Sequence, residues 1–355
     1  MKKYLILFNN MTPADGVFRS ACSLANLLAE QPDTEVTLRP IFKFTKDSLE
    51  LIDKRIIVKP KYKFYFKGFK RLFSLIPNKL LYKMMVKGKY DVEIGFCIII
   101  PHRAISASKN KEAEHIIWTH GYEYHDFYKK ADKVMCVSYE NVERMKKDIN
   151  NAVPVYPCLN IMDEKKIISS SMEPIDLVRN DSPLFVSVAR LSPEKGYKRL
   201  IEIVNRLVNE DGYKMQLWLV GDGPQTNELK QLCKKYALED VVTFCGSQIN
   251  PHKFTKKADC FVLPSYGEGY STSSAEAIVV GKPVITTNVG GAKEIIESAN
   301  SGLIVENTDE GLYQGMKKVL DNPEILKEWE KETLKNRKKF FSQARKQAIL
   351  DALKA

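Results

Sequence analysis

Residues 264–291, PSYGEGYSTSSAEAIVVGKPVITTNVGG, decide how the fold of the chain is interpreted. The stretch follows a short apolar run, residues 260–263, that is typical of a buried strand, and it opens a helix near Ser271. Between strand and helix lies Gly267-Glu268-Gly269, where two glycines allow tight turning and close approach of a ligand to the backbone. The start of such a helix offers unpaired N–H groups and a positive dipole end. The sequence therefore predicts a phosphate-type anion site after this strand.

Two carboxylates flank the predicted anion site: Glu268 in the loop and Glu276 about one turn into the helix. A carboxylate can accept two hydroxyl hydrogen bonds from a sugar or ribose, so the pattern suits a ligand that carries phosphate and hydroxyls together. The structural alternative, for either glutamate alone, is a helix acid stabilised by the dipole or a solvated loop residue. These residues by themselves leave both interpretations open.

The alternation of strands and helices predicts the fold class. From residue 184 onward, apolar strands and helical stretches follow one another without pause, which indicates a parallel sheet covered on both faces. The first half shows further strands, beginning at 3–8, and 355 residues are long for one core. We expect an α/β protein with Rossmann-like domains at 1–163 and 182–335, a polar linker at 164–181 and a final helix at 336–355.

Composition restricts the class of protein. An apolar content of 44%, with 16 Phe and 16 Tyr, supports packed cores. The seven cysteines lack CxxC spacing, which favours free thiols in a reducing compartment over a disulfide frame or a zinc site. Because no apolar run approaches the ~18 residues of a spanning helix, we expect a cytoplasmic protein. The formal charge of +11 indicates an acidic partner: nucleic acid, anionic lipid or a phosphorylated substrate.

The chain resembles the family 4 glycosyltransferases of the GT-B fold. The hallmark of that family is two glutamates separated by seven residues, as Glu268 and Glu276 are in EGYSTSSAEAIVVGKPVITT. A second family block is ARLSPEKG, which contains Arg190 and Lys195. The resemblance covers residues 180–310 well and the first 160 in patches. It implies two Rossmann-like domains that face each other across a cleft, and a last helix that crosses back to the N-terminal domain, where it could be seated by Phe340, Phe341, Ala344 and Ile349.

The resemblance also implies roles for the residues of the second domain. Glu268 would contact the donor sugar and Glu276 the ribose hydroxyls of a nucleotide sugar, while Arg190 and Lys195 would neutralise its diphosphate. The local pattern agrees, because Arg190 closes the strand at 184–189 and Lys195 precedes the next helix, so both charges point into one strand-end crevice. The loop and the helix start supply the other substrate-binding candidates: Gly269, Tyr270, Ser271 and Thr272.

The N-terminal domain supplies two further candidates. His120 follows the strand at 115–119 directly and matches the family histidine that faces the donor sugar, where it can hydrogen-bond a hydroxyl and help stabilise charge near the leaving oxygen. A histidine at a strand end is otherwise often structural, and His125 lies close by. Gly16 opens a helix at 16–30 and matches one glycine of the family's paired-glycine loop, with Asp15 in place of the other.

We therefore expect a retaining glycosyltransferase that transfers a hexose or N-acetylhexosamine from a UDP-sugar to a glycan or lipid-linked glycan in cell-surface polysaccharide synthesis. Retention is implied by the family. No Asp-x-Asp pair occurs, so we expect neither a metal nor another cofactor. The alternative is a catalytically silent relative that acts as a partner or membrane-recruiting subunit. Such a protein is expected to lose some catalytic candidates, whereas all four are present: Arg190, Lys195, Glu268 and His120.

Residues 59–89, KPKYKFYFKGFKRLFSLIPNKLLYKMMVKGK, contain ten Lys or Arg, seven aromatics and no acid. Apolar side chains recur at helical spacing on either side of Pro77, which breaks the helix. A basic amphipathic stretch can lie on anionic lipid, which predicts peripheral contact with the inner face of the cell membrane. The alternative is a helix pair whose apolar face packs on its own domain. No recognisable nucleic-acid-binding module surrounds the stretch, so we expect no nucleic-acid partner.

Overall fold

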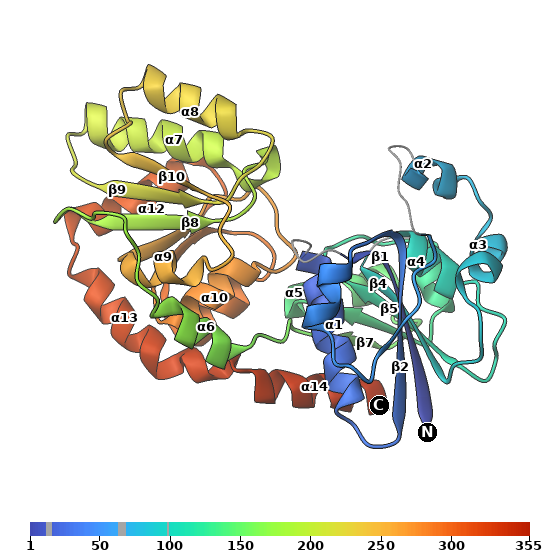
Figure 1. Ribbon diagram of the computed structural model, residues 1–355. Coiled ribbons are helices and arrows are strands. Elements are labelled where there is room, and N and C mark those ends of the chain that lie inside the picture. The colour runs from blue at the N-terminus through green and yellow to red at the C-terminus, as the bar shows by residue number, and fades with distance from the viewer. Residues whose placement is uncertain (12–15, 63–68, 98) are drawn as a thin grey trace. The chain divides into compact units, whose positions relative to one another are not determined.

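The computed structural model describes residues 1–11, 16–62, 69–97 and 99–355. The chain forms two compact units, one of Met1–Ile161 with Arg345–Ala355 and one of Met162–Ala344. Each unit is a parallel sheet covered by helices (Figure 1). The predicted α/β class with two parallel-sheet domains is therefore confirmed.

The sheet of the first unit has seven strands among the described residues, all parallel, in the order β3-β2-β1-β4-β5-β6-β7. The central strand β1 carries a continuous buried run from Leu5 to Phe8, as expected of a parallel sheet that helices cover on both faces. The strands are β1 (Lys2–Met11), β2 (Thr34–Phe44), β3 (Ile57–Val58), β4 (Val92–Cys97), β5 (Glu114–Thr119), β6 (Lys133–Cys136) and β7 (Val155–Pro157).

The helices of the first unit follow the strands in the βα order that parallel connections require. Pro77 separates α2 from α3, so the helix break predicted there is confirmed. The helices are α1 (Gly16–Ala29), α2 (Phe69–Ser74), α3 (Asn78–Met85), α4 (Ile99–Ile105) and α5 (Tyr139–Asp148), with 3₁₀ turns at Lys46–Leu51 and Asp126–Lys130.

The sheet of the second unit has six parallel strands in the order β10-β9-β8-β11-β12-β13. The strand order therefore reverses between β8 and β11, which pair directly through Cys260 with Phe185 and Phe261 with Val186. Ligands of open parallel sheets bind outside the carboxyl ends of the strands at such a reversal. The strands are β8 (Leu184–Val188), β9 (Gln216–Val220), β10 (Val242–Gly246), β11 (Cys260–Leu263), β12 (Val284–Thr287) and β13 (Gly302–Val305).

Helices cover both faces of the second sheet, with α7 and α8 on one side and α9 and α10 on the other (Figure 1). The apolar core joins α7, α8 and α12 to the buried faces of β8, β9 and β11. The helices are α6 (Glu164–Ser171), α7 (Tyr197–Asn205, continued as a π-helical turn over Arg206–Glu210), α8 (Thr226–Lys235), α9 (His252–Lys257), α10 (Thr272–Val280), α11 (Ala292–Ala299), α12 (Asp309–Asp321) and α13 (Ile325–Asn336), with 3₁₀ turns at Pro193–Lys195 and Arg337–Phe340.

The predicted linker at 164–181 is only partly irregular. Its first half is helix α6, whose N-cap Asp163 accepts a hydrogen bond from the backbone N–H of Lys166. Ile167 on this helix is buried, and the carbonyl of Ser170 accepts a hydrogen bond from Asn250. An N-cap and one apolar anchor are enough to make the polar stretch part of the second unit.

The final helix also differs from its predicted bounds. Helix α14 (Ser342–Lys354) starts six residues after 336, and only its part from Arg345 onward belongs to the first unit. There Ile349 is buried, and the ammonium of Lys133 donates to the carbonyls of Ala352 and Leu353 at the helix end. Phe340 is buried and precedes this part of the helix, in the range of the second unit, so its proposed role in seating the helix stays a prediction.

Candidate functional site

Two loops meet at the reversal point of the second sheet. Residues 189–196 follow β8 and are called the β8 loop, and residues 264–271 follow β11 and are called the β11 loop. The N–H of Tyr266 donates to the carbonyl of Glu194 at 3.0 Å. Gly196 has φ of +71°, and a Cβ on it would lie 2.0 Å from the carbonyl oxygen of Pro264. A glycine is therefore what lets the two backbones touch.

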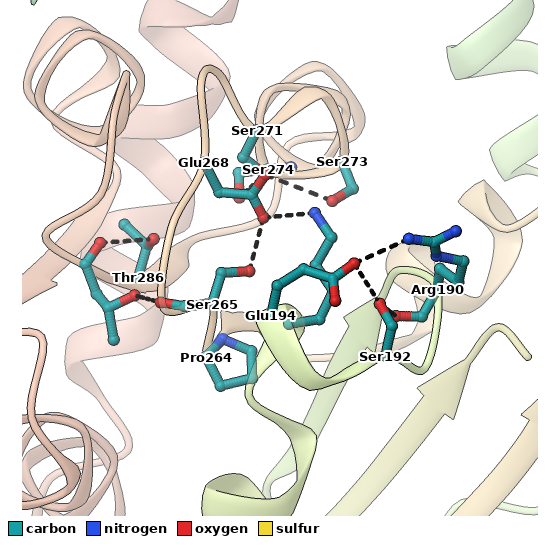
Figure 2. Close-up of polar contacts among 12 residues, drawn as sticks. Arg190, Ser192, Glu194, Pro264, Ser265, Glu268, Ser271, Ser273, Ser274 and Thr286 are labelled. Carbon is teal, nitrogen blue, oxygen red and sulfur yellow. Dashed lines mark hydrogen bonds and ion pairs between the residues drawn. The ribbon is translucent and has the colours of Figure 1, made fainter. Parts of the chain in front are cut away.

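Lys195 and Glu268 form an ion pair between these loops (Figure 2). The Nζ of Lys195 donates to Oε1 of Glu268 at 2.7 Å, and the hydroxyl of Ser265 donates to the same oxygen at 2.6 Å. The two side chains are 23% and 11% exposed, so the pair is largely shielded from solvent while still reachable from it. Oε2 of Glu268 accepts no hydrogen bond from the described residues and can receive a ligand hydroxyl.

Arg190 lies beside this pair but bonds to a different acid. Its Nη2 donates to Oε1 of Glu194 at 2.9 Å, and Ser192 donates to that oxygen at 2.6 Å. The hydroxyl of Ser192, the backbone N–H of Glu194 itself and the guanidinium of Arg190 together lower the pKa of Glu194 to about 2, so this carboxylate is charged at neutral pH. Because Arg190 is 69% exposed, the pair is weak, about 0–1 kcal/mol, and the guanidinium can turn to a bound anion at little cost.

The ion pair between Arg190 and Glu194 was not predicted from the sequence. Glu194 lies within the family block ARLSPEKG, in which only Arg190 and Lys195 were given a role. A carboxylate close to two cations that are proposed to bind a diphosphate should weaken that binding, because its negative charge repels the phosphates. In the structure it orders the β8 loop: its side chain holds Arg190 and Ser192, and its carbonyl accepts from the β11 loop.

The start of α10 agrees with its prediction only in part. Ser271 is the N-cap, and its hydroxyl accepts from the N–H of Ser274 at 3.2 Å and donates to the Ser274 hydroxyl at 2.8 Å (Figure 2). The hydroxyl of Ser271 therefore caps the helix, and the predicted role of this residue in substrate binding stays a prediction. Thr272 begins the helix, and Glu276 lies half-buried one turn later.

Gly269 and Tyr270 are supported from behind by the glycine pair at 290–291. A Cβ on Gly290 would lie 2.4 Å from the carbonyl oxygen of Glu268, and one on Gly291 would lie 2.8 Å from the ring of Tyr270. Tyr270 is buried, which makes its ring a packing element of the β11 loop. The backbone of Gly269 is half-buried at the bend of this loop.

Arg199 holds the β11 loop in place, a function that sequence reasoning missed. This buried guanidinium donates to the carbonyls of Pro264 at 2.5 and 2.8 Å and of Ser265 at 2.7 Å, and to Oδ1 of Asn307 at 2.9 Å. Thr287 adds a hydroxyl bond to the Ser265 carbonyl at 2.7 Å. The loop that carries Glu268 is thereby anchored to α7 and β12, which pre-organises its side chains.

His120 lies in the first unit, directly after β5, at a cavity of about 400 Å³. Its ring centroid is 4.8 Å from that of Phe96, and its buried Nε2 has no hydrogen-bond partner among the described residues. Burial lowers the pKa of His120 to about 4, so the imidazole is neutral at pH 7. The other lining residues are His102, Thr119, Gly121, Tyr122, Glu123 and Tyr128.

His102 stabilises the strand end behind this cavity. Its Nε2 lies 3.1 Å from the carbonyl oxygen of Trp118, which can only accept, so we assign the proton to Nε2. Its Nδ1 then accepts from the hydroxyl of Tyr128 at 2.8 Å. Burial lowers the pKa of His102 to about 3, which keeps this arrangement neutral.

The remaining candidates of the first unit have simpler surroundings. His125 pairs with Glu123 at 2.9 Å and stacks on Phe127, so its ring is engaged locally. Gly16 is the first residue of α1 and is exposed. Asp15 lies outside the described residues.

The described residues contain no group of three or more His, Cys, Asp or Glu side chains placed to hold a metal ion. None of the helices described is both long and apolar enough to span a membrane.

Comparison with known proteins places these observations in a family. Residues 172–336 match the model of "Glycosyl transferases group 1". An uncharacterized glycosyltransferase from Methanocaldococcus jannaschii is 32% identical over 231 residues, which are 63% of this chain and 55% of that protein. A Campylobacter jejuni protein is 29% identical over 230 residues, 64% of this chain and 60% of that protein. It is named N-acetylgalactosamine-N,N'-diacetylbacillosaminyl-diphospho-undecaprenol 4-alpha-N-acetylgalactosaminyltransferase. The match thus spans little more than half the length of these relatives.

Solved structures show the fold. Sucrose-phosphate synthase from Thermosynechococcus elongatus superposes with a TM-score of 0.79 at 17% identity, covering 100% of this chain and 98% of that one. HepE of Anabaena, solved in complex with UDP, superposes with a TM-score of 0.70 at 16% identity and covers 100% of both chains. Arg190, Lys195, Glu268 and Glu276 all lie inside the region that matches the group 1 glycosyl transferases, and the chain as a whole has the GT-B fold.

Proposed function

We propose that the protein is a retaining glycosyltransferase that moves a hexose or N-acetylhexosamine from a UDP-sugar to a hydroxyl of a glycan or lipid-linked glycan in cell-surface polysaccharide synthesis. The observation that carries the proposal is the contact between Lys195 and Glu268 at the carboxyl edge of β8 and β11. It combines a cation for phosphate and a carboxylate for sugar hydroxyls in one place. The name of the Campylobacter jejuni relative and the UDP in the HepE structure support this choice of donor and acceptor class.

In the proposed reaction, the bond between the sugar C1 and the diphosphate oxygen breaks, and a bond from C1 to the acceptor oxygen forms. The electron pair of the broken bond stays on the leaving diphosphate oxygen of UDP, so negative charge grows there, and that oxygen takes up the proton that the acceptor hydroxyl loses. A site accelerates this step by aiming fixed donors at that charge. We assign this task to Arg190, Lys195 and the N–H groups at the start of α10.

The free state prepares both cations for this task. An ammonium has three donors, and only one of those on Lys195 is used by Glu268, so the others can reach a phosphate. Arg190 needs only to leave an exposed ion pair. Glu268 would meanwhile accept a sugar hydroxyl at Oε2, and Glu276 would accept the ribose hydroxyls. Gly269 and Thr272 would offer backbone groups where the loop becomes helix.

His120 would take part as a neutral group. With its pKa lowered to about 4, the imidazole gives no proton at neutral pH and instead hydrogen-bonds a substrate hydroxyl in the cavity of the first unit. Its buried Nε2, which has no partner among the described residues, is the atom available for that bond. Leaving such an atom unpaired costs free energy, which a bound hydroxyl would recover.

The decisive measurement is UDP release from a panel of UDP-sugars, with and without candidate acceptors. Arg190→Ala and Lys195→Ala should abolish release while the circular dichroism spectrum stays unchanged. Lys327→Ala is the matched control, because Lys327 forms a fully surface-exposed ion pair with Glu324 away from the site. Turnover by Arg190→Ala at the wild-type rate would contradict the assignment of the diphosphate. Chelation with EDTA should leave the rate unchanged, since no metal is proposed.

A further inference from the structure

The helix pair α2 and α3 carries a surface that the glycosyltransferase site does not use. Leu72, Leu75 and Leu80 are 54%, 79% and 48% exposed, although they lie within nine residues of one another. Single exposed leucines are ordinary, but three on one helix–turn–helix form a local apolar projection. Residues 63–68, which belong to the basic stretch singled out by composition, lie outside the described residues, and the surface considered is formed by residues 71–89.

The same two helices also have a buried apolar side, which separates the roles of their residues. Phe73, Leu81 and Met85 are buried in the core of the first unit. The alternative expected from sequence, a helix pair packed on its own domain, is therefore correct for these three residues. Phe73, Leu81 and Met85 anchor the helix pair to the core. The three exposed leucines are directed away from that core and do not contribute to it.

The charges around the leucines all have one sign. The exposed cations are Arg71, Lys79, Lys83, Lys87 and Lys89, and segment 59–89 contains no acid. None of the five forms an ion pair with another described residue. Five cations without ion-pair partners among the described residues, together with exposed leucines, suit a partner that offers both negative charge and an apolar interior, as an anionic lipid bilayer does. A nucleic acid would satisfy the cations but would leave the leucines in water.

Hydrogen bonds from Arg103 connect the turn between α2 and α3 to α4. Arg103 on α4 donates to Oδ1 of Asn78 at 2.8 Å and to the backbone carbonyls of Ser74 at 3.0 Å and Ile76 at 2.6 Å. These carbonyls belong to the turn between α2 and α3 that presents Leu75. Figure 1 shows this helix pair beside α4 in the first unit. A turn fixed in this way presents its leucine without an ordering cost on binding.

We propose that the surface of Leu72, Leu75 and Leu80 with the surrounding lysines docks the protein onto an anionic lipid bilayer. The leucines enter the boundary between headgroups and acyl chains, and the cations lie among the anionic headgroups. This inference does not depend on the proposed glycosyl transfer, because docking needs neither donor nor acceptor. Its effect would be to hold the protein at the membrane surface, where lipid-linked molecules reside.

The test is co-sedimentation with phosphatidylcholine vesicles with and without phosphatidylglycerol, at low and raised salt. The wild-type chain should sediment only with the anionic vesicles. The double variant Leu72→Ser with Leu75→Ser should lower the partition coefficient roughly tenfold or more. The double variant Lys79→Gln with Lys83→Gln should lower it about 25-fold, because each cation contributes about fivefold. The matched controls Leu334→Ser and Lys234→Gln with Lys235→Gln, all exposed on the second unit, should sediment as wild type.

Three results would overturn the proposal. The first is a wild-type chain that stays in the supernatant with anionic vesicles. The second is a leucine double variant that sediments as well as wild type, since the leucines would then not insert. The third is retention of single-stranded RNA on a filter without vesicle binding, which would assign the cations to nucleic acid. An unchanged circular dichroism spectrum and unfolding transition show that the first unit of each variant is folded, and UDP binding in solution tests the donor site of the second unit separately, so a failure of docking is distinct from a failure of the proposed activity.

Discussion

Glu268→Gln and Lys195→Ala should change UDP affinity in opposite directions, although the two residues form one ion pair. In the free protein the ammonium of Lys195 is held by Glu268 at 2.7 Å, with both side chains mostly buried. A diphosphate that binds the remaining donors of that ammonium shares its positive charge with Glu268. Glutamine at 268 removes the competing charge but keeps the shape, so UDP should bind as well as before or up to about fivefold tighter, the equivalent of about 1 kcal/mol.

Lys195→Ala removes the cation itself. A hydrogen bond to a charged group contributes about 1.5–3 kcal/mol, so the Kd of UDP should rise about 10- to 150-fold. Turnover should fall in both variants, in Glu268→Gln because the sugar loses its carboxylate acceptor. Calorimetric titration with UDP separates the two effects, and steady-state turnover with the matching UDP-sugar completes the comparison. Equal weakening of UDP binding in both variants would refute the idea that Lys195 serves the diphosphate while Glu268 serves the sugar.

Three further outcomes follow from the geometry. Arg199→Leu leaves the buried carbonyls of Pro264 and Ser265 without their donor and should lower the free energy of unfolding of the second unit by about 3–5 kcal/mol in urea titrations; a loss below 1 kcal/mol would contradict the anchoring role. Gly196→Ala puts a methyl group 2.0 Å from the Pro264 oxygen at a left-handed φ, so it should separate the two loops and abolish UDP binding. Wild-type affinity for UDP in this variant would show that the loops need not touch. The pKa of His120 falls from 6.5 in the unfolded chain to about 4 in the folded protein, so its contribution, about 3 kcal/mol, is fully present above pH 6.5 and is lost as the pH falls toward 4; His120→Asn should flatten the pH dependence of stability in that window, and an unchanged slope would assign it to other groups.

The sequence predicted the elements better than the contacts between them. Continuous apolar runs such as β11 and glycine-rich strand ends are local signals, so the sheet and the Gly267-Glu268-Gly269 bend could be expected from residues 260–271 alone. The N-cap Ser271 was likewise visible, but the bond between its hydroxyl and the N–H of Ser274 was seen only in the structure. Whether a serine hydroxyl caps a helix or binds a ligand depends on its rotamer and its neighbours. Local sequence spacing gives neither the rotamer nor the neighbours.

Contacts between distant segments were the part that sequence reasoning could not supply. Arg199 lies in an ordinary amphipathic helix, and only the closeness of Pro264, 65 residues later in the chain, makes its guanidinium the anchor of the β11 loop. The linker was misjudged for a related reason. Its polar composition predicted a linker, and the helix that forms its first part has one buried residue, Ile167, and one N-cap, Asp163.

The pairing of both diphosphate candidates with carboxylates explains how such a site can exist without its ligand. Two bare cations on adjacent loops would repel each other and leave the loops poorly fixed. Lys195 is instead neutralised by Glu268 across the loops, and Arg190 by Glu194 within one turn. A diphosphate with its sugar can replace both carboxylates as partners of the cations, while the hydroxyls of the sugar replace the cations as partners of Glu268. The exchange leaves only Glu194 without a cation, and that carboxylate is exposed and keeps its hydrogen bond from Ser192. A donor that lacks the sugar should complete only half of the exchange.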